Sequence, residues 1–418
     1  MQRDQLKGII MELKINYITG YAGTGKSTEL LKLSKTLDPK NSIIIAPTHK
    51  ALTRLINSLG LDNNIEFKTI HSLLGWIPTI NENAKHINGI DTTISLDLPL
   101  SAYKNIVIDE GGMMSEDMLM EIVGKIDCLG YDADGNLEDP EIANSMMIMH
   151  IYLDPYQLLP VRGQQIQVDP DTTRNLTTQY RSESKDIVDL YTRYVTYLAT
   201  NGMVDNTSDP IVYSDNILPF SIKDFKVGDR LLAYTNKAVG TWNKHIAKQL
   251  GINSYVGQEV QLGNMIDTLV VDDWYEFSGI DEIIEHFNNG TLILQNSRIS
   301  KEYLEYSLKA LLSHKDIKFI KSGLCIYPVI PGIYKARNIL HKAKEEALKN
   351  RKMFKHIYTL GRAFIMDYTF ATTVHKSQGS EFSTVYVDKK DISKAIDKST
   401  YARLMYVAIS RCINKLYI

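Results

Sequence analysis

A short segment near the start of the chain has the residue types and spacing of a phosphate-binding loop. Residues 20–27 read GYAGTGKS and satisfy G-x-x-x-x-G-K-[ST], between an apolar stretch and a helical pattern. Glycines let backbone N–H groups surround phosphates, the lysine reaches the terminal phosphates, and the hydroxyl of Ser27 is a ligand that Mg²⁺ accepts. We therefore expect ATP and Mg²⁺ to bind at Gly20, Gly23, Thr24, Gly25, Lys26, Ser27 and Thr28.

An acidic pair further along the chain could complete this site. Asp109 and Glu110 directly follow an apolar strand candidate at residues 105–108. Hydrolysis of a nucleoside triphosphate needs a metal ligand and a group that positions the attacking water. We assign Asp109, with Ser27, to the metal and Glu110 to the water. Taken alone, an acidic pair after a strand is more often an ordinary strand end without a catalytic role. Because the phosphate-binding loop precedes it in this chain, we interpret the pair as part of the nucleotide site.

These residues need a scaffold that brings separate segments together. Short apolar strands alternate with helical patterns over the first 175 or so residues, with candidates at 15–19, 43–46, 105–108 and 147–153. Each ends in polar or Gly-rich residues, where open α/β sheets bind ligands. The pattern resumes with candidates at 231–235, 368–373, 384–388 and 415–418. The sequence thus predicts two α/β units with parallel sheets.

Composition sets limits on the class of protein. The chain has 418 residues, 44% of them hydrophobic, and 47 basic against 49 acidic residues, so we expect several globular domains with any polyanion site confined to one region. Its three cysteines lie far apart, which offers neither a metal clasp nor a disulfide framework. No apolar run approaches the roughly 20 residues of a membrane span. We expect no membrane association and a reduced cytosolic location.

Two segments break the alternation of strands and helices. Residues 78–101 are polar and β-rich, and Asn88-Gly89 is typical of a hairpin turn. Residues 251–365 look like a small β-barrel with additions, with strand candidates at 256–262, 269–275 and, after Asn289-Gly290, 292–295. A basic helical pattern covers 334–358; such a charge run is as often a solvated face as a strand-binding surface.

Six motifs, in this order along the chain, resemble those of superfamily 1 helicases. They are residues 20–27, 46–51 (APTHKA), 69–73 (TIHSL), 109–113 (DEGGM), 154–158 (DPYQL) and 372–382 (TTVHKSQGSEF). The last run is especially similar to the RecD branch, and the segment LAYTNK at 232–237 to the phage Dda type, which together represent superfamily 1B.

The resemblance implies an α/β fold of two RecA-like P-loop motor domains with two insertions. The motor domains would be 1A (1–77 and 102–175) and 2A (176–250 and 366–418). The insertions would be a β-hairpin, 1B (78–101), and a Src-homology-3-like barrel, 2B (251–365).

The resemblance also implies roles at single positions. Gln5 matches an adenine-reading glutamine, although Gln2 competes for that place, and Gln157 matches a sensor of the γ-phosphate. Tyr180 would stack on the base, and Arg181 and Arg411 would be arginine fingers. The alternative interpretation of either arginine is that it forms an ion pair on the protein surface. The implied catalytic set is Lys26, Asp109, Glu110, Gln157, Arg181 and Arg411; nucleotide contacts add Gln5, Tyr180, Gly379 and Glu381.

A motor that moves on one strand needs contacts to phosphate and sugar. By motif position, the first domain would contribute Thr48, His49, Lys50, Thr69, His71 and Ser72, and the second Thr235, Asn236, Lys237, Asn243, Thr373, His375 and Lys376. The alternative interpretation of His49, His71 and His375 is that each has a structural role and does not contact the strand. The segment 78–101 matches in position the strand-separating pin of this type, although it lacks a large aromatic side chain at its turn.

The function that the resemblance implies is an ATP-dependent DNA helicase that translocates 5′ to 3′ on single-stranded DNA and unwinds duplex DNA at forks. The direction rests wholly on the resemblance. An RNA helicase and a P-loop ATPase that remodels protein–nucleic acid complexes stay open, because grooves that follow a backbone differ little between DNA and RNA. A nucleotide kinase is disfavoured, since no acceptor pocket is evident. We expect a monomer in a bacterial cytoplasm, phage-encoded, with replication or repair proteins as candidate partners.

Overall fold

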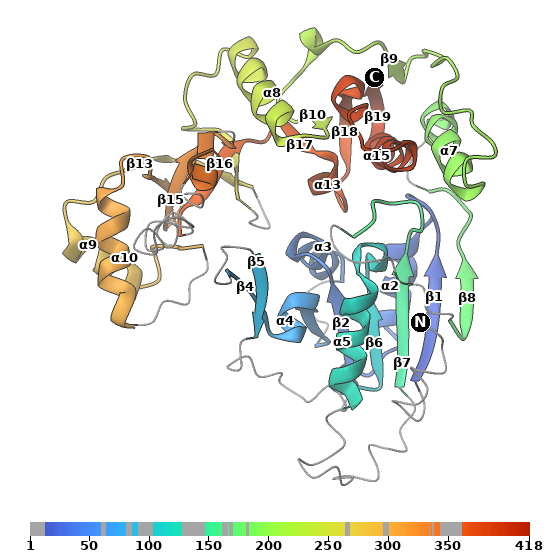
Figure 1. Cartoon of the computed structure of the whole chain (residues 1–418), viewed down its shortest axis with the longest axis horizontal. Helices are drawn as coiled ribbons and strands as arrows, with labels where there is room; N and C mark the ends of the chain where they lie inside the picture. Colours follow the sequence, from blue (N-terminus) through green and yellow to red (C-terminus); the bar gives the residue numbers. More distant parts are fainter. Residues whose placement is uncertain are drawn as a thin grey trace.

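Two parallel sheets, a mixed sheet and a two-stranded hairpin make up the described part of the chain (Figure 1). The computed structural model describes residues 13–59, 64–80, 86–90, 103–127, 147–160, 166, 170–180, 184–263, 268–295, 301–333, 335–336, 338–342 and 362–418. Within these residues no helix is both long and apolar enough to cross a bilayer. The α/β fold class with parallel sheets, predicted from the alternation of strands and helices, is confirmed.

The first parallel sheet has the strand order β3-β2-β6-β7-β1-β8. Its strands are β1 (Leu13–Thr19), β2 (Ser42–Ala46), β3 (Glu66–Thr69), β6 (Asn105–Ile108), β7 (Met147–Leu153) and β8 (Thr172–Asn175). The helices of this unit are α2 (Lys26–Ser34), α3 (His49–Leu59), α4 (Ile70–Leu74) and α5 (Glu116–Asp127), with short 3₁₀ turns at Pro39–Asn41 and Gly111–Met113.

Strand β2 shows why this sheet is parallel and covered on both faces. Ile43 and Ile45 are fully buried in one core, and Ile44 is fully buried in the core on the opposite face. A strand with apolar side chains on both faces is stable only between two layers of helices. The isoleucine run therefore places β2 in the interior of the sheet.

The second parallel sheet has the order β17-β10-β18-β19-β9. Its strands are β9 (Ile217–Leu218), β10 (Arg230–Ala233), β17 (Ala371–Thr373), β18 (Phe382–Val387) and β19 (Cys412–Tyr417). Its helices are α7 (Lys185–Ala199), α8 (Asn236–Gln249), α13 (Val374–Ser377), α14 (Lys389–Ile392) and α15 (Lys398–Ser410), with a 3₁₀ turn at Ile222–Asp224. Helix α15 is buried almost all round, with residues 404–410 each inaccessible or nearly so.

The core around α15 joins the two units. It contains Ile187 and Tyr194 of α7 together with Ala22 and Leu158, which belong to the first unit. Because apolar side chains of both units leave water in one cluster, the association of the units is part of the hydrophobic stabilisation. Figure 1 shows α15 beside α7, above the first parallel sheet.

The inserted segment between the two halves of the second unit forms a mixed sheet, in the order β12-β11-β16-β15-β14-β13. The strands are β11 (Glu259–Leu262), β12 (Leu269–Val270), β13 (Asp273–Tyr275), β14 (Lys318–Ser322), β15 (Cys325–Pro331) and β16 (Phe364–Tyr368). Helices α9 (Ile280–Asn288) and α10 (Lys301–Ser313) accompany them. The strands at the two edges of this sheet, β12 and β13, are connected in the chain by residues 271–272 alone. That the segment is a Src-homology-3-like barrel stays a prediction.

Two sequence-based strand expectations in this region are wrong. Residues 292–295 form no strand; Leu292 makes a single bridge to Ile326. The preceding Asn289 caps α9, because its N–H bonds back to the carbonyls of Glu285 and Phe287. The strand expected at 368–373 is two strands in different sheets, since β16 ends at Tyr368 and β17 begins at Ala371.

The hairpin consists of β4 (Trp76–Ile80) and β5 (His86–Ile90), which pair antiparallel from Trp76 opposite Ile90 to Ile80 opposite His86. The turn expected at Asn88-Gly89 is wrong: both residues lie within β5, opposite Pro78 and Ile77. The pairing starts earlier than expected because Gly75, in a left-handed conformation, ends α4 and leads directly into β4. The connecting residues 81–85 lie outside the described residues, as do 91–101 and most of the basic stretch 334–358.

We predict that Asp391→Ala lowers the free energy of unfolding of the second unit by about 2 kcal/mol. The buried carboxylate of Asp391 accepts hydrogen bonds from the N–H of Tyr234 (3.0 Å) and of Thr235 (2.7 Å) and from the Thr235 hydroxyl (3.0 Å). Urea unfolding followed by tryptophan fluorescence measures the change. Glu276→Ala, at an exposed carboxylate, is the control; equal losses in both variants would contradict this role of Asp391.

Candidate nucleotide-binding cleft

The phosphate-loop sequence forms the turn between β1 and α2, at the carboxyl end of β1. Gly23 and Gly25 have φ values of 81° and 87°, which side chains rarely adopt. A Cβ added to Gly20 would lie 2.3 Å from the Thr24 hydroxyl oxygen and 2.8 Å from the Leu176 carbonyl oxygen. The path of this loop therefore requires glycine at three of the predicted positions.

The Lys26 side chain folds back onto its own loop. Its ammonium donates to the carbonyl oxygens of Gly20 (2.5 Å) and Tyr21 (3.0 Å), and it lies 3.9 Å from Asp154 Oδ2. Phosphate oxygens would compete with these acceptors for the same ammonium. The lysine predicted to bind phosphate thus lies against the loop that would surround the phosphates. The next two predicted residues differ in exposure: Ser27 is partly buried and Thr28 is exposed.

The acidic pair lies at the end of β6, as predicted. Asp109 is 3% exposed, and burial together with the neighbouring Glu110 raises its pKa to about 6, against the opposing effect of Arg54. Glu110 has φ 51°, a left-handed conformation that costs a non-glycine residue about 1–3 kcal/mol. Strain of this kind is maintained where surrounding contacts fix a side chain in a functional position.

An arginine that the sequence analysis did not identify lies between the loop and the acidic pair. Arg54 of α3 places Nη2 3.4 Å from the Ser27 hydroxyl, 3.4 Å from Asp109 Oδ2 and 3.6 Å from Glu110 Oε1. Burial would lower the pKa of Arg54, but the surrounding carboxylates, Glu110 foremost, raise it. No local signal marks Arg54, because its partners come from three separate segments.

The donor set fits Mg²⁺. The Ser27 hydroxyl and the Asp109 carboxylate both face one point, since the same Arg54 nitrogen contacts each of them. The described residues contain no group of three or more His, Cys, Asp or Glu side chains that could hold a metal ion. Mg²⁺ in nucleotide sites characteristically takes only one or two protein ligands and completes its shell with water and phosphate oxygens.

Arg54 also connects the two units. Its Nη1 donates to the carbonyl oxygen of Gly379 at 3.1 Å, and Gly379 (φ 75°) follows α13 of the second unit. Glu381, two residues further, contributes to the raised pKa of Arg54. Two residues that the sequence analysis assigned to nucleotide binding therefore lie at the same edge as Asp109 and Glu110.

Gln157 is a second point of contact between the units. Its buried side chain accepts from Gln378 Nε2 at 3.4 Å, across the cleft. Arg403 of α15 donates Nη1 to the backbone carbonyls of Gln157 (2.6 Å) and Pro155 (2.8 Å). Neither Gln378 nor Arg403 was identified as a site residue, because the sequence does not show which face of α15 meets residues 154–157.

The remaining nucleotide candidates differ in their placement. The Tyr180 N–H bonds to the Gly23 carbonyl (2.8 Å), and its side chain is 74% exposed beside the loop. Arg411 is fully buried; its guanidinium donates to the carbonyls of Val407 and Ser380 and to the Ser410 hydroxyl, all in the second unit. Gln5 and Arg181 lie outside the described residues.

The strand-binding candidates of the first unit lie where α3 and α4 begin. Thr48 is exposed and its hydroxyl accepts from the Ala51 N–H, while His49 and Lys50 are the first residues of α3. Thr69 is buried and caps α4 by accepting from the Ser72 N–H; His71 and Ser72 are partly buried.

The second unit repeats this arrangement. Thr235 caps α8 and Thr373 caps α13, each by accepting a backbone N–H three residues ahead. Asn236 is partly buried and Lys237 is exposed, whereas burial lowers the pKa of His375. Asn243 contradicts the expected strand contact: it is fully buried, and its amide oxygen accepts from the Ala371 N–H, which fixes α8 against β17.

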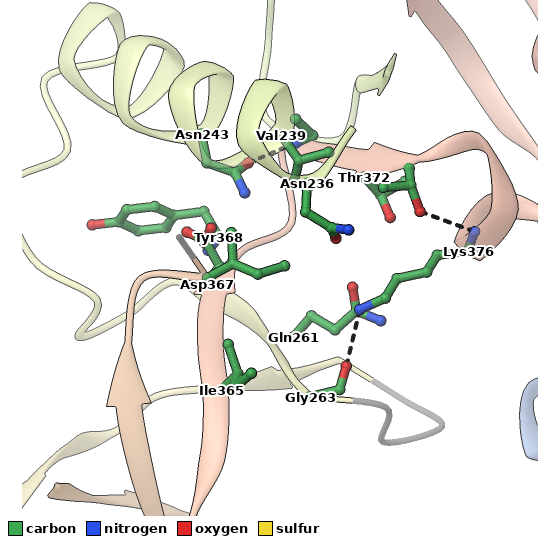
Figure 2. A pocket seen from close by; sticks show the side chains of 13 residues that line it. Asn236, Val239, Asn243, Gln261, Gly263, Ile365, Asp367, Tyr368, Thr372 and Lys376 are labelled. Carbon is green, nitrogen blue, oxygen red and sulfur yellow. Dashed lines mark hydrogen bonds between the residues drawn. The ribbon is translucent and has the colours of Figure 1, made fainter. Parts of the chain in front are cut away.

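A small cavity of about 60 Å³ lies between α8, β17 and the mixed sheet (Figure 2). Lys376 spans it and donates to the Gly263 carbonyl at 3.2 Å. Asp367 lines it, and burial raises the pKa of Asp367 to about 6. The cavity thus joins expected strand-binding residues to the inserted sheet.

Two family models match parts of the chain. Residues 1–131 match the AAA domain model, and residues 368–418 match the UvrD-like helicase C-terminal domain model. The first match includes the phosphate loop, Arg54 and the acidic pair, and the second includes α13 and α15. The two matched segments therefore include Arg54 and Gly379, which are hydrogen-bonded between the units, whereas Gln157 lies outside both matches.

Similar proteins extend over nearly the whole chain. An uncharacterized protein of Acanthamoeba polyphaga mimivirus is 24% identical, over 96% of this chain and 94% of that protein. Solved structures of Pif1 helicases are also similar. The one from Candida albicans is 16% identical over 99% of this chain and 93% of that chain, with a TM-score of 0.49. The one from Bacteroides in complex with ADP-AlF3 and single-stranded DNA is 14% identical over 97% of this chain and 88% of that chain, with a TM-score of 0.46.

We predict that Asp367→Asn stabilises the protein above pH 6 and has little effect below pH 4. The folded-state pKa of Asp367, about 6, is above its unfolded value, so its contribution to stability is present at low pH and is lost as pH rises through about 6. The neutral, isosteric amide avoids that loss, which reaches about 3 kcal/mol. Thermal midpoints of both proteins between pH 4 and 8 measure it; a constant difference across this range would contradict the raised pKa.

Proposed function

We propose that this chain is an ATP-driven DNA helicase of superfamily 1B that translocates 5′ to 3′ on single-stranded DNA and unwinds duplex DNA. The observation that carries the proposal is that residues of both units are in contact at the predicted nucleotide site. The phosphate loop and acidic pair come from the first unit, while Gly379, Gln378 and Arg403 reach the same cleft from the second. A site shared in this way converts hydrolysis into relative motion of the units.

The chain's own residues would handle the nucleotide as follows. Backbone N–H groups of the loop bind the phosphates, and Lys26 turns from the Gly20 and Tyr21 carbonyls toward the terminal phosphate. Glu110, close to Asp109 and Arg54, orients the attacking water. When bound, Mg²⁺ would be held by Ser27 and Asp109 and would supply positive charge to the phosphate oxygens.

Arginines would provide the charge that hydrolysis requires. Arg411 is buried in the second unit and contacts the Ser380 carbonyl, next to Gly379 at the cleft. To act as an arginine finger it must leave these acceptors, which makes its use depend on the position of the second unit. Arg181 is the other proposed finger, Tyr180 the proposed base-stacking residue, and Gln5 the proposed adenine reader.

The strand would be bound by the threonine-capped segments of both units. Thr69 and Thr373 use their hydroxyl oxygens as acceptors in the caps, so their hydroxyl hydrogens can be donated to a phosphate oxygen, whereas the Thr235 hydroxyl donates to Asp391 and would have to exchange that acceptor. Such contacts follow the backbone and do not read bases. They suit stepping along a strand of any sequence.

The choice of DNA and the direction rest on the motif resemblance. The match of residues 368–418 to the UvrD-like helicase C-terminal domain favours a helicase over a nucleotide kinase. An RNA helicase and an ATPase that remodels protein–nucleic acid complexes are the alternatives that the experiment must distinguish.

We predict that the protein hydrolyses ATP faster with single-stranded DNA and unwinds a duplex with a 5′ tail but not one with a 3′ tail. Lys26→Ala should reduce hydrolysis by about 100-fold or more, because it removes a charge aimed at the phosphates. Binding to a fluorescent single strand should persist, since Lys26 bonds to its own loop at Gly20 and Tyr21 and is not one of the proposed strand-binding residues.

Tailed DNA and RNA duplexes, tested side by side, check this prediction. Unwinding of tailed RNA alone would favour the RNA helicase, and hydrolysis without any unwinding would favour the remodelling ATPase. Unwinding from a 3′ tail would contradict the proposed direction.

We further predict that the β4–β5 hairpin acts at strand separation. Replacing the connecting residues 81–85 with a Gly-Ser turn should abolish unwinding while DNA-stimulated hydrolysis continues, because the described strands of the hairpin, 76–80 and 86–90, supply none of the side chains assigned to the nucleotide site. A Gly-Ser replacement of residues 264–267, the connection between β11 and β12, is the matched control. Loss of hydrolysis together with unwinding would mean that the hairpin belongs to the motor, and unchanged unwinding would exclude it as the pin.

A further inference from the structure

A tyrosine of the second unit is hydrogen-bonded inside the phosphate loop of the first. Tyr406 of α15 is fully buried, and its hydroxyl accepts the backbone N–H of Ala22 at 2.7 Å. The same hydroxyl donates to Asp154 Oδ2 at 2.5 Å. Both partners belong to the first unit, so this contact crosses the interface between the units.

Asp154 extends the contact to the phosphate-binding lysine. Its Oδ2 atom, which accepts from Tyr406, lies 3.9 Å from Lys26 Nζ, and its Oδ1 atom accepts from the Tyr156 N–H at 3.0 Å. Burial and the Asp154 carboxylate raise the pKa of Tyr406 well above its usual value, so the hydroxyl keeps its proton and remains a donor. One hydroxyl is thereby joined to the loop backbone and, through one carboxylate, to Lys26.

The same face of α15 holds the neighbouring backbone. Arg403 precedes Tyr406 by three positions, the spacing that puts two side chains on one helix face. Its bonds to the carbonyls of Pro155 and Gln157 fix the segment that carries Asp154. A displacement of α15 would therefore change the positions of Asp154 and the Ala22 N–H together.

Helix α15 is coupled to the strand-binding segments. Val374, the first residue of α13, lies in the same core as Tyr406, and Thr373 caps α13. Close-packed interiors transmit displacements because they contain few voids. A shift of the 373–376 segment on binding a strand would reach the phosphate loop through this core and this hydroxyl.

We infer that Tyr406 is a positioning residue, whose hydroxyl transmits the placement of the second unit to the phosphate loop and Lys26. The inference rests on the proposed function for its role in strand-stimulated hydrolysis, but the hydrogen bond itself can be tested in the protein without nucleotide or DNA. A tyrosine required only for packing would be replaced by phenylalanine without effect on the loop.

Hydrogen exchange of the Ala22 amide is the first test. In nucleotide-free protein, Tyr406→Phe should speed exchange of this amide by about tenfold, the factor that corresponds to losing about 1.4 kcal/mol. Tyr386→Phe is the matched control, since Tyr386 is also fully buried in the second unit but lies on β18, away from the loop. Unchanged Ala22 exchange in Tyr406→Phe, or equal acceleration in both variants, would overturn the inference.

The second test measures coupling. The ratio of ATP hydrolysis with and without single-stranded DNA should fall by about tenfold in Tyr406→Phe and stay at the parent value in Tyr386→Phe. A retained ratio in Tyr406→Phe would overturn the role in coupling. If the parent protein itself shows no stimulation, the proposed function fails, and the exchange measurement still decides whether Tyr406 holds the loop.

A third variant covers the case in which Tyr406→Phe does not fold. Asp154→Asn keeps the shape of the side chain and removes the charge that accepts from Tyr406 and faces Lys26. It should accelerate Ala22 exchange in the same direction. Protection equal to that of the parent would contradict the connection between Tyr406, Asp154 and the loop.

Discussion

The parallel register of the first sheet is the constraint on which the site depends. Thr19 lies opposite Leu153, and Ile45 lies opposite Ile108, so the segments that follow β1, β6 and β7 all leave the sheet at one edge. This brings the phosphate loop, Asp109-Glu110 and residues 154–157 together although they come from three separate segments of the chain. The buried isoleucines of β2 stabilise the arrangement, because strands with two apolar faces need a layer of helices on each side.

The second constraint is the shared core around α15. Ala22 and Leu158 of the first unit are buried in one apolar cluster with side chains of α7 and α15. Hydrogen bonds from Arg54 to Gly379, from Gln378 to Gln157 and from Tyr406 to Asp154 also cross between the units. Hydrogen bonds can exchange partners at modest free-energy cost, whereas separating the apolar cluster would expose it to water. The apolar cluster is therefore the part of the interface that is more costly to separate.

Charge balance in the cleft explains why Arg54 lies where it does. Burial, together with repulsion from the adjacent Glu110 carboxylate, raises the pKa of Asp109 to about 6. A guanidinium within 3.6 Å of both offsets that repulsion and also reaches the second unit. A cation that binds Ser27 and Asp109 would compete with Arg54 for the same oxygens. Nucleotide and metal binding would therefore alter a contact that joins the units.

The sequence by itself determined the elements with a local signal. The glycine spacing of the phosphate loop, the strand before Asp109 and the alternation that gives two parallel sheets could all be read from short windows, because backbone geometry and β-branched runs impose them locally. It did not determine the hairpin turn, where the end of α4 sets the pairing and Asn88-Gly89 lies within a strand. Nor did it identify Asn243 as buried, or Arg54, Arg403 and Tyr406 as parts of the cleft. The partners of these side chains lie on other elements or on the other unit, and only the packing of α3, α8 and α15 in the tertiary structure decides which helix face meets them.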